Sequence, residues 1–90
     1  MTVLIDQPRW PAHSTFFSHL VSDASLEELH AFAKRHSIPR RAFDRDHYDL
    51  PAARFADVVA AGAVPVSNRE LVLALNRSGL RVSLRVRRGL

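Results

Sequence analysis

The stretch FDRDHYDLP, residues 43–51, holds the densest group of side chains in this sequence that could do chemistry. Three aspartates, one histidine and one tyrosine fall within the six positions from Asp44 to Asp49. Carboxylates that crowd together repel one another, so such a group is best tolerated when a cation or an arginine lies among them. A bulky aromatic beside an imidazole, Tyr48 beside His47, is also a poor choice for an ordinary turn. We therefore interpret this segment as a candidate site.

The acids of this segment are suited to holding a divalent cation. Oxygen-rich sites suit Mg²⁺ or Mn²⁺, and an added imidazole shifts the preference towards Mn²⁺, Fe²⁺ or Zn²⁺. The predicted metal ligands are Asp6, Asp46 and Asp49. His47 would be a further ligand or a general base, so the predicted catalytic residues are Asp6, His47 and Asp49. With Mg²⁺ or Mn²⁺ as cofactor, such a site could activate water and hydrolyse a phosphate or phosphodiester bond in nucleic acid or a nucleotide.

Each of these residues also has a structural explanation. Asp6 could cap the turn before the following proline, and Asp49 could cap the next helix through its side chain. Asp46 could point into solvent beside a neighbouring arginine. His47 and Tyr48 could be a partly buried pair that covers the edge of a sheet. Both interpretations stay open for every one of them.

Further residues could contact a ligand beside the metal. Trp10 is a candidate stacking platform for a base, although core packing is the commoner role of a lone tryptophan. His13 and His19 lie early in the chain and could form a wall or lid. The complete set of predicted ligand-binding residues is Trp10, His13, His19, Tyr48, Arg85 and Arg87.

The positive charge lies at the C-terminal end of the sequence. Six arginines and one acid, Glu70, fall within residues 69–90, whereas acids outnumber basic residues by eight to seven in residues 1–68. Arginine makes planar, two-pronged contacts to phosphate or carboxylate, which favours an anionic partner such as nucleic acid or a nucleotide. A GC-rich genome would produce the same preference for arginine.

The elements that must position these residues alternate between strands and helices. Two segments, Ser25 to Glu28 and Ser67 to Glu70, have the spacing of capping boxes, which start helices. Gly62 and Gly79 are placed to end helices in the left-handed conformation. The sequence predicts strands over residues 2–6, 41–44, 63–67 and 80–87, and helices over residues 13–23, 25–37, 51–62 and 67–79.

This order of elements predicts one small domain over residues 1–90, because a chain of this length can bury a single core. Strands separated by helices pair in parallel through right-handed crossovers. The expected fold is a compact three-layer, Rossmann-like α/β domain with a short, mostly parallel sheet of about four strands. In such a sheet ligands bind beyond the carboxyl ends of the strands. Asp6, the acids of residues 44–49 and Asn68 should therefore share one rim.

Composition excludes several classes of protein. Cysteine is absent, which removes disulfides, thiolate metal sites and cysteine nucleophiles. The apolar stretches are far shorter than the roughly 20 residues that a membrane span requires. The opening MTVLIDQPRW places Asp6 and Arg9 where the apolar part of a secretory signal would lie. We expect a cytoplasmic, soluble protein with no membrane partner.

Several segments together resemble a small family of bacterial and phage-borne proteins known only as a domain of unknown function. The segments are DQPRWP followed by His13, then HLVSD, ELHAFA, DHYD and GAVPVSNRELVLALNRSGLR. The resemblance covers nearly the whole chain and implies no activity. Where this chain has Ser14, relatives tend to have glycine after the first-loop histidine.

A second resemblance is to the PIN-like metal-dependent nucleases. It rests on VLID, which ends at Asp6, and on the rhythm of VPVSNRELVLALNRSGLRV. It implies that Asp6 is a metal ligand, with the other ligands supplied by Asp46 and Asp49. This chain has Asn68 where that family usually places an acid.

Three hypotheses for function follow from these patterns. The first is a metal-dependent hydrolase, which accounts for the cluster of acids. The second is a non-catalytic binding module for a nucleotide or a partner protein. The third is a homo-oligomeric regulatory domain that pairs through its C-terminal strand, residues 80–87, where alternating arginines make a poor central strand.

Overall fold

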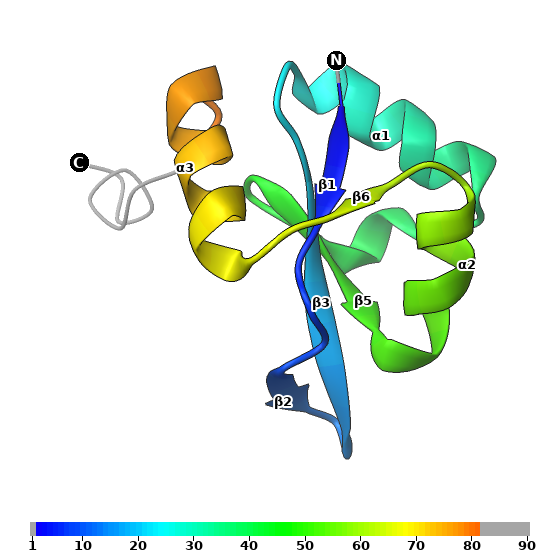
Figure 1. Cartoon of the computed structure of the whole chain (residues 1–90). Helices are drawn as coiled ribbons and strands as arrows, with labels where there is room; N and C mark the ends of the chain where they lie inside the picture. Colours follow the sequence, from blue (N-terminus) through cyan, green and yellow to red (C-terminus); the bar gives the residue numbers. More distant parts are fainter. Residues whose placement is uncertain (1, 82–90) are drawn as a thin grey trace.

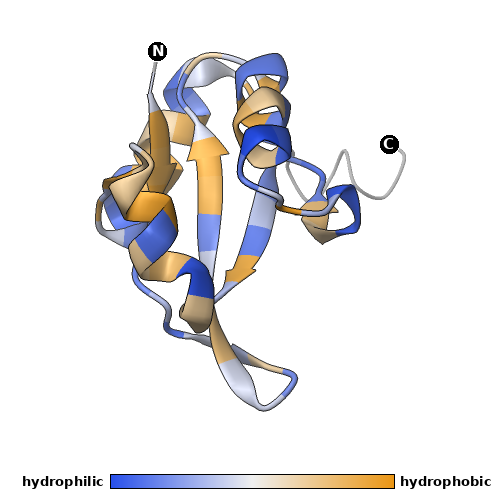
Figure 2. Cartoon of the chain, turned by 90° about the vertical axis from the view of Figure 1, so that its right-hand side faces the viewer, coloured by the Kyte–Doolittle hydropathy of each residue, from blue (hydrophilic) through white to orange (hydrophobic). Residues whose placement is uncertain are grey.

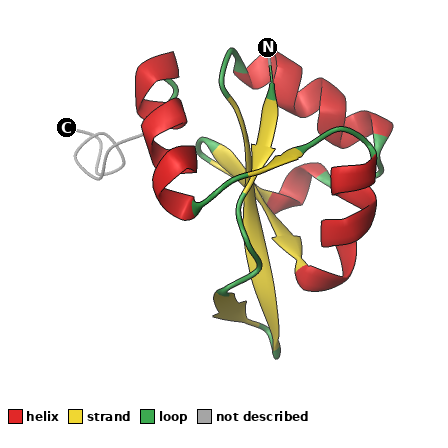
Figure 3. Ribbon diagram, viewed as in Figure 1, coloured by secondary structure: helices red, strands yellow, loops and turns green. Residues whose placement is uncertain are grey.

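The protein has an α/β fold in which one mixed sheet of six strands is combined with three α-helices, and the computed structural model describes residues 2–81 (Figures 1 and 3). The sheet has the order β4-β5-β3-β1-β6, and β2 pairs with β3 beside this path. The strands are β1 (Val3–Ile5), β2 (Trp10–Ala12), β3 (Thr15–Ser22), β4 (Phe43–Asp44), β5 (His47–Pro51) and β6 (Val64–Pro65). The helices are α1 (Leu26–Arg35), α2 (Phe55–Ala60) and α3 (Asn68–Ser78), with 3-10 turns η1 (Arg40–Ala42) and η2 (Ala52–Arg54).

The prediction of a mostly parallel, four-stranded sheet is wrong. Only β1 and β6 pair in parallel among residues 2–81, and the other four pairings are antiparallel. A Rossmann-like arrangement depends on a run of parallel strands, so that part of the prediction is not confirmed. The single parallel pair joins the first strand to the strand before α3, a pairing that the sequence did not specify.

The predicted helix over residues 13–23 is also wrong, because this segment forms the long central strand β3. The adjacent residues Leu20 and Val21 of β3 have the spacing of a helical stripe, yet both are fully buried and lie on opposite faces of the sheet. A strand that is covered on both faces has a continuous apolar run, which cannot be told from a helix by spacing alone. His13 and Ser14, at φ 47° and 64°, form the tight turn that joins β2 to β3.

The predicted polar loop of residues 44–49 is instead a hairpin. Strands β4 and β5 pair directly, with Asp44 opposite His47, so only two residues form the turn. Arg45 adopts the left-handed conformation there, at φ 61°. Partly exposed and buried residues alternate along β5, because neighbouring side chains of a strand point to opposite faces of the sheet.

Helices α1 and α3 begin and end close to where the sequence predicts, but the prediction that a helix starts at Pro51 is wrong, because Pro51 is the last residue of β5 and α2 begins only at Phe55. Ser67 and Glu70 form a complete capping box at α3, and Gly79 ends this helix at φ 78°. Ser25 caps α1 by accepting a hydrogen bond from the Glu28 backbone at 3.0 Å. The Glu28 carboxylate, however, accepts from the Ser22 hydroxyl and so ties α1 to the end of β3.

Helices cover the sheet on both faces, so the predicted three layers are present. Helices α1 and α2 pack on one face around Ile5 and Leu20, whereas α3 packs on the other face against Leu4 and Val21. Hydrophilic residues interrupt the hydrophobic ones along the strands (Figure 2). The buried apolar cluster beneath α3 is the smaller of the two, and the polar side chains of His19, His47 and Asn68 lie beside it.

The predictions for the C-terminal segment concern residues that the structure does not describe. The C-terminal strand over residues 80–87, with Arg85, Arg87 and the suggested pairing of subunits, lies almost wholly outside residues 2–81.

None of the helices within residues 2–81 has both the length and the apolar character needed to cross a bilayer.

Candidate functional site

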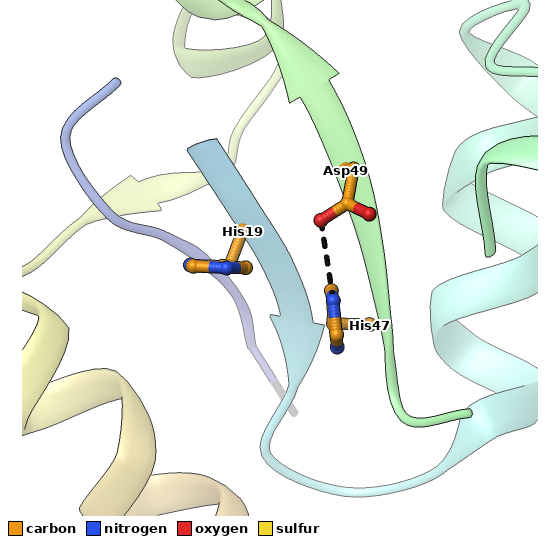
Figure 4. Close-up of side chains that lie close together, drawn as sticks. All are labelled: His19, His47 and Asp49. Atoms are coloured by element: carbon orange, nitrogen blue, oxygen red, sulfur yellow. Dashed lines mark ion pairs between the residues drawn. The ribbon is translucent and has the colours of Figure 1, made fainter. Parts of the chain in front are cut away.

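Three potential metal ligands meet on the face of the sheet that α3 covers. His19 lies on β3 directly opposite Asp49 on β5, and His47 points to the same face two residues before Asp49. One ligand atom from each of the three side chains lies within 4.8 Å of the others (Figure 4). The Nε2 atom of His47 is 3.2 Å from Oδ1 of Asp49. The alternation of antiparallel strands thus produces a cluster of two imidazoles and one carboxylate.

A buried carboxylate stands behind each imidazole. Asp6 Oδ2 is 2.8 Å from Nδ1 of His19, and Asp46 Oδ1 is 2.6 Å from Nδ1 of His47. The two carboxylates are 1% and 0% exposed, respectively. Histidines that bind metals usually donate their second N–H to a carboxylate in this way, which fixes the ring and the tautomer. Because Nδ1 of each ring is hydrogen-bonded to a carboxylate, Nε2 is the atom of each ring that would bind a metal ion.

Asp6 is committed to hydrogen bonds with the protein. Its Oδ1 accepts from the His19 backbone at 2.6 Å, and its Oδ2 accepts from Trp10 Nε1 at 3.2 Å and Asn68 Nδ2 at 2.9 Å. Burial would raise the pKa of Asp6, but the hydrogen bonds from His19 and Asn68 outweigh it and lower the pKa below 3.8. An ionised Asp6 can only accept, so Nδ1 of His19 must carry the proton.

His47 lies between two carboxylates. Burial would lower the pKa of its imidazole, but hydrogen bonds and charge from Asp49 and Asp46 outweigh burial and raise it above 6.5. The protonated ring can donate to both carboxylates at once. A metal ion that binds Nε2 must therefore displace a proton, which makes metal affinity depend on pH.

Two adjoining hollows lie beside this cluster, while Asp49 borders a third hollow that is also lined by Trp10 and Arg41. One, of about 240 Å³, is lined by His19 and His47 together with Trp10, Asn68, Arg81 and four apolar residues, three of them from α3. The next, of about 390 Å³, is lined by Asp6, Arg9, Trp10 and Asn68 among others. Trp10 and Asn68 belong to both hollows. One arginine therefore lines each hollow: Arg81 lines the first and Arg9 the second.

The structure brings together only part of the predicted site. His47 and Asp49 belong to the cluster, while Asp6 and Asp46 lie behind its histidines. His19, predicted as a wall residue, takes the third position. The signal in the sequence for the pairing of His47 with Asp49 was their spacing of two, which puts both side chains on one face of a strand.

The other predicted ligand-binding residues lie in three places. Trp10 borders the hollows and is 43% exposed. His13 lies in the exposed β2–β3 turn, where its ring contacts the edge of Phe17. Tyr48 is buried on the opposite face of the sheet, and its hydroxyl forms a hydrogen bond with Nδ1 of His30. The predicted rim is present where Asn68 meets Asp6, beyond the parallel strands, but the ligands from β5 lie on the face of an antiparallel strand.

Residues 3–78 match a protein family described as "Protein of unknown function (DUF4031)". The match covers most of the chain, so the chain belongs to this family. No curated protein and no solved structure matches it. Nothing in these comparisons supports the resemblance to PIN-like nucleases, so the site must be interpreted from its own geometry.

Proposed function

We propose that this member of a family of unknown function binds a divalent transition-metal ion through His19, His47 and Asp49. We further propose that it uses the ion to hydrolyse phosphate or phosphodiester bonds. One observation carries the proposal: two imidazoles, each backed by a buried carboxylate, meet a third carboxylate with their ligand atoms within 4.8 Å. A solvated group of charges has no need for such paired orientation.

The donor set favours Zn²⁺, Mn²⁺ or Fe²⁺ over Mg²⁺. Two nitrogen donors and one oxygen donor suit borderline metals, whereas Mg²⁺ prefers oxygen ligands and retains its water. Of the two ions that the sequence suggested, Mn²⁺ fits this set and Mg²⁺ fits it poorly. Three protein ligands leave at least one coordination position for water or substrate, as catalytic sites require.

The surroundings of the cluster suit an anionic substrate. A bound metal ion would lower the pKa of its water and polarise a phosphoryl oxygen. Arg81 lines the same hollow as the two histidines, and Arg9 lines the adjoining one. Either guanidinium could contact the remaining phosphate oxygens. Trp10, with its indole N–H held by Asp6, offers an exposed ring on which a nucleobase could stack.

A second candidate function is a binding module without catalysis. It is favoured by the chain Asp46–His47–Asp49, in which a protonated His47 satisfies both carboxylates without any metal. In that case the cluster would stabilise the α3 face of the sheet, and the hollows beside Trp10 would bind a nucleotide or another ligand directly. The two functions differ in whether the ligand needs a metal.

The test is a thermal-unfolding titration with Zn²⁺, Mn²⁺ and Mg²⁺. We would compare the wild type with His19→Gln, His47→Gln and Asp49→Asn. The matched control is His13→Asn, which removes an exposed histidine outside the cluster and places at φ 47° a residue that tolerates this conformation. A ligand at a hundred times its dissociation constant stabilises the folded state by about 2.7 kcal/mol, which unfolding resolves.

We expect Zn²⁺ or Mn²⁺ to raise the midpoint of the wild type and the control, and to leave the three cluster variants unchanged. Equal shifts in all five proteins, or none in the wild type, would refute the metal site. Hydrolysis of bis-p-nitrophenyl phosphate and p-nitrophenyl phosphate by the metal-loaded protein then tests catalysis. Metal binding without turnover would refute the hydrolytic part of the proposal, and ligand binding that needs no metal would favour the binding module.

A further inference from the structure

Another pocket lies on the opposite side of β5, between this strand and α1. Its volume is about 230 Å³, and it is lined by His30, Lys34, Ile38, Arg40 and Tyr48. Two of these residues are permanent cations at neutral pH, one is an imidazole and one is a phenol. None of the five is an acid. The metal cluster, by contrast, contains one carboxylate and is supported by the carboxylates of Asp6 and Asp46.

The polar groups of this pocket are held in place by the core. Tyr48 is 1% exposed, and its hydroxyl is 2.7 Å from Nδ1 of His30. The ring of Phe43 packs against the His30 ring at 4.6 Å and against the Tyr48 ring at 5.2 Å. The guanidinium carbon of Arg40 lies 5.4 Å from the centre of the Phe43 ring, which holds this cation at the wall of the pocket.

Within the part of the chain that the structure describes, the charge of the pocket is not neutralised. Within residues 2–81, no carboxylate pairs with Lys34 or Arg40. Burial and the charge of Arg40 lower the pKa of His30 below 6.5, so this imidazole is neutral at pH 7. If the buried Tyr48 hydroxyl donates to Nδ1 of His30, then Nε2 carries a proton and is a further donor.

We propose that His30, Lys34, Arg40 and Tyr48 form a binding site for a phosphate group. The two unpaired cations supply the charge, and the neutral imidazole supplies a hydrogen-bond donor at the base of the pocket. Pockets for drug-sized ligands occupy about 300–1,000 Å³, so this one is sized for a small anion or for the terminal phosphate of a monoester. The site is independent of the metal cluster, because Tyr48 faces away from its neighbours His47 and Asp49.

The test measures phosphate binding in the presence of EDTA, so that no metal contributes. Inorganic phosphate, AMP and sulfate would each be titrated into the full chain while the imidazole signals of His30 are followed by NMR. The variants are Lys34→Gln and Arg40→Gln. Arg41→Gln is the matched control, since Arg41 belongs to the same 3-10 turn but lines a different pocket. His19→Gln separates this site from the metal cluster.

We expect saturable binding of phosphate that moves the His30 signals, with affinity about tenfold lower in each of Lys34→Gln and Arg40→Gln. The control and His19→Gln should bind as the wild type does. Tighter binding of AMP than of inorganic phosphate would identify a monoester as the ligand, and the reverse would identify the free anion. Absence of saturable binding, or equal losses in Arg40→Gln and Arg41→Gln, would overturn the proposal.

Discussion

The two faces of β5 carry side chains that belong to groups of opposite electrostatic character. His47 and Asp49 point towards α3 and join a group in which imidazoles and carboxylates pair with one another. Tyr48 points towards α1 and joins a pocket whose cations have no acidic partner within residues 2–81. The first face is suited to a cation and the second to an anion. A run of three residues thus contributes to two sites of opposite electrostatic character because a strand alternates its side chains.

The largest expected effect concerns the unequal cores beneath these two faces. Leu20 and Val21 are adjacent and fully buried, but Leu20 belongs to the large cluster under α1 and α2, and Val21 to the small cluster under α3. Leu20→Ala should lower the free energy of unfolding by about 2–5 kcal/mol. Val21→Ala removes less and should cost less. Denaturant unfolding of both variants checks the order, and an equal or greater cost for Val21→Ala would contradict it.

A smaller effect is expected when the support of one histidine is removed. Asp6→Asn keeps the size of the side chain but replaces an acceptor oxygen by a donor, so Nδ1 of His19 loses its carboxylate. Loss of such a partner typically costs about 10–100-fold in metal affinity. We therefore expect Zn²⁺ affinity, measured by competition with a chelator, to fall within that range. Phosphate binding at the pocket of Tyr48 should not change.

The Asp6→Asn result needs a control for general damage, because Asp6 accepts four hydrogen bonds. Trp10→Phe removes one of these donors and leaves the carboxylate in place. It should keep most of the metal affinity. If Trp10→Phe weakens Zn²⁺ binding as much as Asp6→Asn does, Asp6 does not act through its charge on His19.

The difference between the two faces also explains how much the sequence could predict. Caps and terminating glycines are local signals, and α1 and α3 lie where these signals place them. The meeting of Asp6 with Asn68 follows from two parallel strands, for which a general rule exists. The site at β5 depends on the pairing of β3 with β5, which are far apart in the chain. No local pattern specifies which strands become neighbours.

His19 shows why the metal cluster was predicted only in part. Its segment was interpreted as a helix because β3 is apolar on both faces near its end, as the pair Leu20 and Val21 shows. With β3 assigned to a helix, His19 could not be placed opposite Asp49, and Asp6 appeared free to bind a metal. One wrong assignment of periodicity therefore left a proposed ligand, His19, out of the predicted ligand set and placed Asp6, which hydrogen-bonds to it, in that set.

The smallest expected effect is a difference in pH dependence between the histidines of the two faces, in the protein freed of metal by EDTA. Asp49 and Asp46 raise the pKa of His47 above 6.5 in spite of burial, so its protonated form is favoured by folding. Its contribution to stability is complete below pH 6.5 and is lost as the pH rises through the raised pKa. Burial and Arg40 lower the pKa of His30, so folding favours its neutral form. That contribution is lost as the pH falls from 6.5 through the lowered pKa.

Denaturant unfolding between about pH 5 and pH 8 separates the two histidines, since this is the range in which imidazoles titrate. His47→Gln should flatten the decline in stability on the alkaline side and leave the acid side as in the wild type. His30→Gln should do the reverse. Added Zn²⁺ should reverse the pH dependence of stability only on the alkaline side, so that stability there rises with pH. The reason is that a metal that displaces the proton of His47 binds more tightly as the pH rises. If both variants changed the same side of the profile, the two faces would not differ in electrostatic character, and the assignment of one to cations and the other to anions would fail.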